Sequence, residues 1–269
     1  MKTETRIEAL RIGTKVCALL CIPLMLGACA TRVSEPAQEA VALESSPWAV
    51  ASSGSVKPGQ WQHREFPGKR QSHYNYVRLD GREAIAARAS SSASMLRQAV
   101  RVEPAELNHL RFSWKVPALI ASADLAVRER ADSPVRVVLA FEGDRSKFSP
   151  KDAMLSELAH ALTGEPMPYA TLMYVWCNKR APGTVLVNAR TSRIRELVLE
   201  SGSRRLSQWL DYERDIRADF TQAFGEPPGA LVSIGIMTDT DNTQSTTQAW
   251  YGPVVHVSRP QARTTVLQP

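Results

Sequence analysis

The chain has 269 residues, of which 43% are hydrophobic and 22% are charged, and its formal net charge is +6. This composition is typical of a globular protein and excludes an intrinsically disordered chain. The basic residues are scattered and do not alternate with aromatic residues, so the sequence predicts no nucleic-acid partner.

The first predicted element is a signal peptide at residues 1–28. Its apolar run, residues 16–28, is too short for a membrane-spanning helix, which needs about 20 apolar residues. A basic start, a short apolar middle and small residues at the end are typical of a signal peptide.

Residues 26–29, Leu-Gly-Ala-Cys, resemble the lipobox of bacterial lipoproteins. That resemblance implies cleavage before Cys29 and lipid attachment to it. Because Ala30 and not an aspartate follows, it also implies anchoring at the periplasmic face of the outer membrane.

Composition divides the rest of the chain into three parts. Residues 29–58 are rich in Ala, Ser, Glu and Pro, which is typical of a flexible tether. Residues 59–258 carry the apolar patterns of a folded domain, and their number suits a single β-sandwich. Residues 259–269 are polar and begin with Arg-Pro, so we expect a loose tail.

Strand patterns dominate the expected domain. Residues 74–79 and 83–87 flank Asp80-Gly81, a dipeptide typical of two-residue hairpin turns. Residues 110–116 alternate between apolar and polar side chains, which indicates a strand with one buried face. Further strands are expected at residues 135–141, 172–176, 232–236 and 250–257.

Two helices are expected between these strands. The first follows Ser149, a capping residue with a proline after it, and its apolar residues repeat at helical spacing until Gly164. A shorter helix is expected from Asp215 or Asp219 to Phe224. Many short strands with one or two inserted helices predict a mainly β fold, either a β-sandwich or a jelly roll.

The densest polar cluster, at residues 238–243, directly follows the strand at 232–236. Asp239, Asp241 and Asn242 offer several hard oxygen atoms over a short loop, and Ca²⁺ prefers such ligands. These residues are therefore a candidate site for a structural Ca²⁺ ion. The alternative is a turn in which the same side chains cap their own backbone or hold an arginine.

Aromatic side chains form a second candidate site. Tyr174, Trp176 and Trp250 lie on expected strands, where rings can stack on sugar faces, and Arg214 can bind sugar hydroxyls. The alternative is burial of these rings in the core, which is common in β-sandwiches. For Arg214 the alternative is an ion pair with Asp215.

The sequence contains no recognisable catalytic motif: no Gly-rich phosphate loop, no HExxH and no GxSxG. Residues far apart in sequence can still form an active site. A glycan hydrolase with paired carboxylates therefore remains an alternative, with Asp215 and either Asp239 or Asp241 as the candidate pair.

Several motifs occur together in a fixed order. They are residues 112–116, 123–124, 136–141, 172–176, 214–216, 224–225, 234–243 and 251–252. In this combination the chain resembles an uncharacterised bacterial family named domain of unknown function 3047, over about residues 60–257. The resemblance implies an exported envelope protein and brings no established activity. Pro253 stands where the resemblance leads us to expect an acid, which weakens the metal interpretation.

The motifs also resemble, more loosely, galactose-binding-type jelly rolls, which often bind glycans and often carry a structural Ca²⁺ ion. A likeness of fold alone does not determine function. Together with the candidate residues, it predicts a lipid-anchored periplasmic module that binds a glycan or another cell-envelope ligand. Besides the hydrolase, one more alternative is open. The bare face formed by Ser233 and Gly235 would bind an envelope protein, and the chain would be a scaffold lipoprotein.

Overall fold

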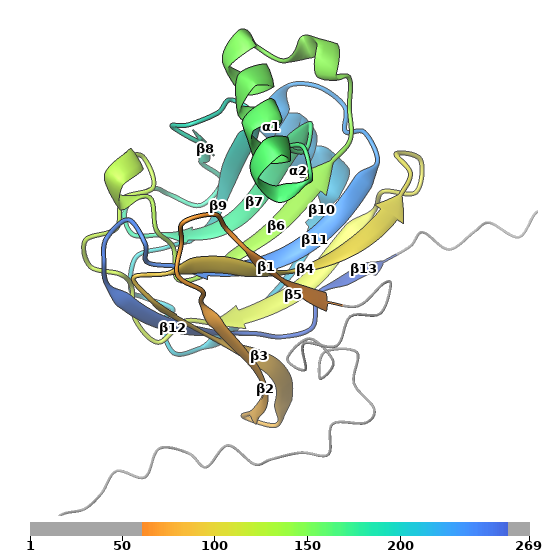
Figure 1. The fold of residues 1–269 in the computed structure, drawn as a ribbon. Coiled ribbons are helices and arrows are strands. Elements are labelled where there is room, and N and C mark those ends of the chain that lie inside the picture. Colours follow the sequence, from red (N-terminus) through yellow and green to blue (C-terminus); the bar gives the residue numbers. More distant parts are fainter. Residues whose placement is uncertain (1–60, 258–269) are drawn as a thin grey trace, which may run out of the picture. The chain divides into compact units, whose positions relative to one another are not determined.

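The fold is seen in a computed structural model that describes residues 61–257 (Figure 1). The predicted signal peptide at residues 1–28, Cys29, the tether at residues 29–58 and the tail at residues 259–269 lie outside the described residues. What the sequence indicates for these segments therefore stays a prediction.

Strands make up most of the regular structure in the described residues. They are β1 (Trp61–Glu65), β2 (His73–Leu79), β3 (Arg82–Ser90), β4 (Ala93–Val102), β5 (His109–Lys115), β6 (Arg136–Phe141), β7 (Ala170–Cys177), β8 (Val185–Val187), β9 (Ile194–Ser201), β10 (Trp209–Asp215), β11 (Leu231–Asp239), β12 (Thr246–Tyr251) and β13 (Val255–Val257). The helices are α1 (Pro150–Thr163), α2 (Ile216–Phe224) and two short 3-10 turns, Arg128–Arg130 and Arg145–Lys147. The predicted mainly β class is confirmed.

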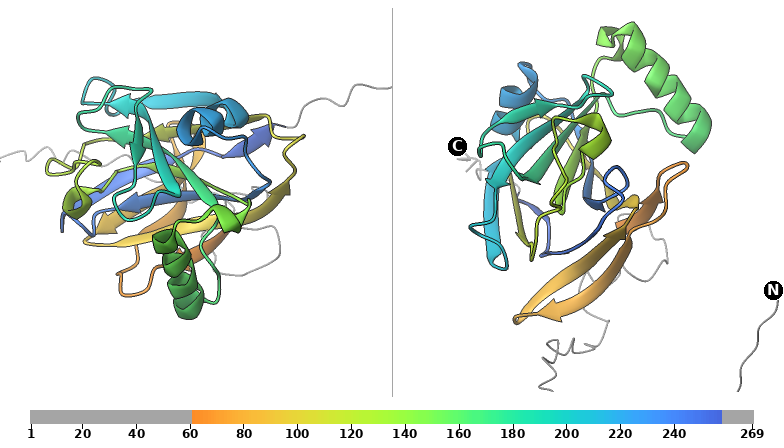
Figure 2. Two further views of the ribbon diagram at one scale, coloured as in Figure 1. Left: turned by 90° about the horizontal axis from the view of Figure 1, so that it is seen from above. Right: turned by 90° about the vertical axis from the view of Figure 1, so that its left-hand side faces the viewer.

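The strands form two sheets, which we call sheet A and sheet B. Sheet A has seven strands in the order β1-β4-β11-β6-β7-β9-β8. Sheet B has the order β10-β5-β12-β3-β2, and β13 pairs with β5. Paired strands are antiparallel except for β7 and β9, which are parallel. The two sheets lie in separate layers, seen from two further directions in Figure 2, and the predicted β-sandwich is confirmed.

The core lies between the facing sides of the two sheets, because side chains alternate from one face of a strand to the other. Leu139 of β6 and Ile236 of β11 point inward from sheet A, and Phe112 of β5 points inward from sheet B. Phe112 stacks on Tyr174 of β7, with the ring centroids 5.5 Å apart. The alternation predicted for residues 110–116 is confirmed, because the even-numbered positions are buried in this core.

The β2–β3 hairpin turns at the predicted dipeptide. Asp80 and Gly81 have φ angles of 52° and 74°. Two consecutive positive φ values are typical of a type I′ turn, which matches the twist of the strands on either side. Leu79 pairs with Arg82 across this turn, so the loop has two residues as expected.

Both α-helices begin and end at capping residues that the sequence predicts. The Ser149 side chain accepts a hydrogen bond from the backbone N–H of Asp152 at 3.1 Å, and Gly164 ends α1 with a φ of 75°. The carboxylate of Asp215 caps α2 in the same way, at 3.0 Å from the backbone N–H three residues later. Asp215 is thus a helix cap. The expected ion pair between Arg214 and Asp215 is not found, and Arg214 pairs with Asp219 instead.

Helix α1 is held by polar contacts to the loop between β8 and β9 and to Arg145. Its buried residues are Asp152 and Ser156. By contrast, Met154, Leu158 and Leu162 are 63%, 52% and 60% exposed. Asp152 accepts hydrogen bonds from two hydroxyl groups of the loop between β8 and β9. Of the helices in the described part of the chain, none is long and apolar enough to cross a membrane.

Candidate functional site

A cleft of about 480 Å³ lies between α1 and the outer face of sheet A. We call it the α1 cleft. Its apolar walls come from elements far apart in the sequence, namely Phe66, Leu125, Leu155, Met167, Met173 and Met237. The buried residues Arg136, Glu196 and Asp239 form what we call its floor, and the exposed Arg128 and Arg190 lie at its rim. Its size is within the usual range for small-molecule sites, about 300–1,000 Å³.

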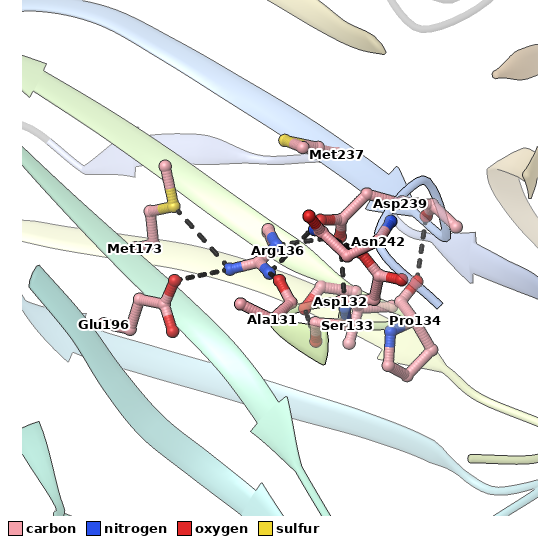
Figure 3. Close-up of polar contacts among 12 residues, drawn as sticks. Ala131, Asp132, Ser133, Pro134, Arg136, Met173, Glu196, Met237, Asp239 and Asn242 are labelled. Atoms are coloured by element: carbon pink, nitrogen blue, oxygen red, sulfur yellow. Dashed lines mark hydrogen bonds and ion pairs between the residues drawn. The ribbon is translucent and has the colours of Figure 1, made fainter. Parts of the chain in front are cut away.

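Arg136 binds two carboxylates on the floor (Figure 3). Its Nε donates to Oδ1 of Asp239 at 2.9 Å, and its Nη2 donates to Oδ2 of the same residue at 3.2 Å. Its Nη1 donates to Oε1 of Glu196 at 2.8 Å, and Nη2 also donates to the carbonyl oxygen of Ala131 at 2.6 Å. The three charged side chains are only 3–4% exposed. Charges buried this deeply require such partners, because their desolvation is costly.

Burial alters the acid–base properties of this network. It raises the pKa of Asp239 to about 6, although the neighbouring Arg136 counteracts part of this shift. Burial alone would lower the pKa of Arg136, but the charges of Asp239 and Glu196 outweigh it and hold that pKa above its ordinary value. The guanidinium therefore stays charged, whereas Asp239 can take up a proton near pH 6.

Glu196 has one carboxylate oxygen without a hydrogen-bond partner among residues 61–257. Its Oε1 binds Arg136, whereas its Oε2 is buried and accepts no hydrogen bond from this part of the chain. In Figure 3 Oε2 points away from the guanidinium. Leaving a buried acceptor unpaired costs roughly 1–3 kcal/mol. A ligand that donates a hydrogen bond to this oxygen would remove that cost.

The predicted metal residues lie beside the floor. Oxygen atoms of Asp132, Asp239 and Asp241 lie within 4.8 Å of one another. However, Asp239 already holds the guanidinium, Asp241 pairs with Lys69 at 2.6 Å, and Asn242 donates its side-chain amide to Asp132 at 2.8 Å. A Ca²⁺ ion would need these oxygens as ligands. The contacts instead fit the alternative interpretation, a turn that caps its own backbone and holds an arginine.

Two of the predicted sugar-binding aromatic residues belong to the core. Tyr174 is 0% exposed and Trp176 is 1% exposed. The Tyr174 hydroxyl donates to Oδ2 of Asp219 at 2.8 Å, and Nε1 of Trp176 donates to the carbonyl oxygen of Gly202 at 3.0 Å. The prediction that these rings contact a ligand is wrong. They alternate along β7 with the cleft residue Met173, so they point between the sheets.

Arg214 belongs to a second network, at the junction of β10, α2 and β7. Its guanidinium binds both carboxylate oxygens of Asp219, with Nε at 2.9 Å from Oδ2, and the same carboxylate accepts the Tyr174 hydroxyl. The Arg214 side chain is 34% exposed. The predicted ligand role of Arg214 is corrected to the ion-pair alternative, with Asp219 as the partner in place of Asp215.

Trp250 is separated from the other predicted residues because it lies on sheet B. Its neighbours along β12 point into the main core, so its own ring lies on the outer face. There it is partly buried and packs, together with Trp209, against the small apolar cluster of Val77, Ala84 and Ala86. The structure thus does not bring Trp250 into the α1 cleft.

The comparison with known families concerns nearly the whole described part of the chain. A family model described as "Protein of unknown function (DUF3047)" matches residues 59–255. The chain belongs to this family. The resemblance noted in the sequence is therefore confirmed, and the matched segment contains every residue named for the α1 cleft. No curated protein matches the chain.

Among solved structures, this DUF3047 protein is similar to the family 11 carbohydrate-binding module of the cellulosomal cellulase Lic26A-Cel5E of Clostridium thermocellum. The identity is 8% and the TM-score 0.38, over 77% of this chain and 92% of that chain. It is also similar to the xyloglucanase domain of NopAA, a type three effector from Sinorhizobium fredii in complex with cellobiose. Here the identity is 9% and the TM-score 0.36, over 74% of this chain and 93% of that chain. At these identities and TM-scores the similarity is no evidence of function, so the function is argued from the residues of the α1 cleft.

Sequence reasoning on this DUF3047 protein does not single out Arg136 or Glu196. The sequence nevertheless contains a pattern that could have identified these two residues. Arg136 begins a strand that is otherwise apolar, and Glu196 directly precedes the apolar residues 197–199. A charged residue on a fully buried strand is rare unless it is paired. Two isolated, opposite charges on separate buried strands therefore predict each other as partners.

Proposed function

We propose that this protein is a glycan-binding module of the bacterial cell envelope, and that the α1 cleft holds the glycan. The cleft combines apolar walls with a few buried polar atoms, which is the usual lining of a site for a small ligand. A sugar ring has the complementary surface, because its C–H faces are apolar and its hydroxyl groups donate and accept hydrogen bonds.

The observation that carries this proposal is that Glu196 lines the cleft and that its buried Oε2 has no hydrogen-bond partner among residues 61–257. A sugar hydroxyl can donate to this oxygen, and a hydrogen bond to a charged group contributes about 1.5–3 kcal/mol. Met173 and Met237 line the cleft beside the floor. Methionine side chains are flexible and polarisable, so they can pack against the uneven C–H face of a sugar.

Calorimetric titration of the full-length chain with a panel of oligosaccharides tests the proposal. Ala159 of α1 lines the cleft, and Ala153 is exposed on the same helix. We expect Ala159→Trp to fill the cleft and to weaken binding at least about tenfold, which corresponds to about 1.4 kcal/mol. The matched control Ala153→Trp should bind like the wild type. Equal affinities of the two variants, or no binding of any glycan in the panel, would contradict the proposal.

We also propose that a lipid on Cys29 holds the domain at the periplasmic face of the outer membrane. The support is the signal peptide that the sequence predicts at residues 1–28 and the Leu-Gly-Ala-Cys segment at residues 26–29. Residues 29–58 would then act as a tether. Metabolic labelling with a fatty-acid probe and fractionation of the membranes test this. We expect Cys29→Ser to lose the label and to leave the outer-membrane fraction, and a label that persists would argue against the anchor.

The alternative of a glycan hydrolase has less support from the geometry. A pKa of about 6 at Asp239 would suit a general acid. However, both oxygens of Asp239 accept hydrogen bonds from Arg136, and one also accepts the backbone N–H of Ser133. Asp215, the other candidate carboxylate, caps α2 at the end of β10 in sheet B. The geometry therefore favours binding over hydrolysis.

A further inference from the structure

The charges on the floor of the α1 cleft indicate the chemistry of the glycan. We infer that the ligand is a glycan with a free amino group, and that the carboxylate of Glu196 binds this group as an ammonium ion. The inference rests on the proposed function and adds to it the charge of the ligand and the residue that recognises it.

Negative charge is in excess among the buried groups at the base of the cleft. On the floor, Glu196, Asp239 and Arg136 are 2%, 3% and 3% exposed, and Asp132, which lies beside the floor, is 2% exposed. Within residues 61–257, Arg136 is the cation that pairs with Glu196 and Asp239, whereas Asp132 is held by neutral amide and hydroxyl donors. The two floor carboxylates thus share one guanidinium, and Asp132 adds a third buried negative charge close to Asp239. Because charges interact more strongly in a medium of low dielectric constant, this excess favours a cationic ligand.

The remaining positive charges around the cleft are closer to solvent. Lys69 is paired with Asp241, so these two charges balance each other. Arg128 and Arg190 are exposed at the rim. Water and salt screen exposed charges over short distances, so their repulsion of a cation at the floor is weak. The deep end of the cleft therefore prefers a positive group, even though arginines surround its mouth.

The unpartnered oxygen makes this preference specific for a hydrogen-bond donor. Arg136 directs its N–H groups to Asp239, to Oε1 of Glu196 and to the carbonyl oxygen of Ala131, so Oε2 of Glu196 depends on a donor from outside. An ammonium group offers three N–H donors together with a positive charge. Charge-assisted hydrogen bonds are about twice as strong as neutral ones. A hydroxyl group supplies the donor without the charge, and an N-acetyl group supplies a single neutral N–H with added bulk.

Matched oligosaccharides separate the contribution of the amine from that of the sugar. The full-length protein is titrated with β-linked tetramers of glucosamine, N-acetylglucosamine and glucose, at a pH at which the sugar amine is protonated. We expect the glucosamine tetramer to bind at least about tenfold more tightly than the other two. Equal affinities for the three tetramers would overturn the inference and leave the glycan-binding function intact. Failure of all three, and of the wider panel, would overturn the proposed function itself.

Two charge-removing variants test the role of Glu196. Glu196→Gln removes the charge on the floor, and Glu157→Gln removes the same charge from the exposed surface of α1. We expect Glu196→Gln to abolish the preference for the glucosamine tetramer, and Glu157→Gln to keep it. A preference that persists in Glu196→Gln overturns the assignment of the amine to this residue.

A third variant and a competing ligand keep the test decisive if Glu196→Gln does not fold. Arg190→Gln removes a screened positive charge from the rim, and we expect it to bind the glucosamine tetramer at least as tightly as the wild type and to keep the preference over the glucose tetramer. Weaker binding of the glucosamine tetramer to this variant would contradict a floor that selects cations. Spermidine serves as an amine without a sugar, and binding as tight as that of the tetramer would assign the cleft to polyamines and refute the glycan ligand.

Discussion

Arg136 and Arg214 both hold buried carboxylates, and their two networks differ in whether every carboxylate oxygen has a hydrogen-bond partner among residues 61–257. Around Arg214, the carboxylate of Asp219 accepts the guanidinium on both oxygens and the Tyr174 hydroxyl on one, so its polar atoms are used within the fold. Around Arg136, Glu196 keeps an oxygen without a partner among the described residues, and this residue lines a cleft. A network whose polar atoms all have partners within the fold contributes to stability. A network that has an unpartnered oxygen on a residue lining a cleft is suited to binding a ligand.

The two networks also differ in burial. The side chain of Arg136 is 4% exposed, and that of Arg214 is 34% exposed. A fully buried charge depends on its protein partners, whereas water can partly replace the partners of a group at the surface. The stability effects of breaking the two networks should therefore be unequal, and the following predictions run from the largest expected effect to the smallest.

The largest effect is expected for Arg136→Met, which keeps the length of the side chain and removes its charge. Glu196 and Asp239 would remain buried without a cation, and removing one partner of a buried pair costs roughly 3–5 kcal/mol. Urea unfolding of the full-length chain measures this loss. Combining the change with Glu196→Gln and Asp239→Asn should restore a large part of the stability, because no unpaired charge is left. A single variant that loses less than about 1 kcal/mol would show that the network contributes little.

A pH dependence should come next in size, and it should belong to the Arg136 network. The pKa of Asp239 in the folded state, about 6, lies above the ordinary value of 3.8, so the folded state binds this proton more tightly than the unfolded state. The free energy of unfolding therefore falls as the pH rises through this window. Between about pH 4 and pH 6.5 the wild type should lose on the order of 2 kcal/mol relative to Asp239→Asn. A difference that does not vary with pH would contradict the raised pKa.

Arg214→Met should have a smaller effect on stability and none on ligand binding. Asp219 would lose its cation, but the site is open enough for water to reach the guanidinium position, so we expect a loss of about 1–2 kcal/mol in urea unfolding. Oligosaccharide titration of the same variant should give the wild-type affinity. Weakened glycan binding would restore Arg214 as a ligand residue and would place the binding site outside the α1 cleft.

The smallest effect is expected from Ca²⁺. Asp239 and Asp241 are held by Arg136 and Lys69, so the melting temperature should be the same in EDTA and in millimolar Ca²⁺. A ligand at 100 times its Kd that binds only the folded state would add about 2.7 kcal/mol, which a melting experiment detects readily. A Ca²⁺-dependent rise that disappears in Asp241→Ala would make the acidic loop a metal site after all.

Strand β7 shows that the sequence does not determine which face of an apolar strand is buried in the core. Tyr174 and Trp176 lie on one face of the apolar strand β7, and Met173 lies on its other face. Alternation predicts that the two faces differ, but it does not say which face meets the second sheet when both are apolar. Aromatic rings suggested a sugar-binding face, whereas the structure buries the rings and directs the methionine into the cleft.

The sequence by itself determined the local structure and the family of this protein. The Asp80-Gly81 turn and the helix caps Ser149 and Asp215 depend only on residues a few positions away. They can therefore be predicted from the sequence alone. Only the tertiary structure decided which distant charges meet. Arg136 lies 60 residues from Glu196 and 103 residues from Asp239, and no spacing rule connects them. Their meeting follows from the strand order of sheet A, which brings β9, β6 and β11 close together and so creates the floor of the α1 cleft.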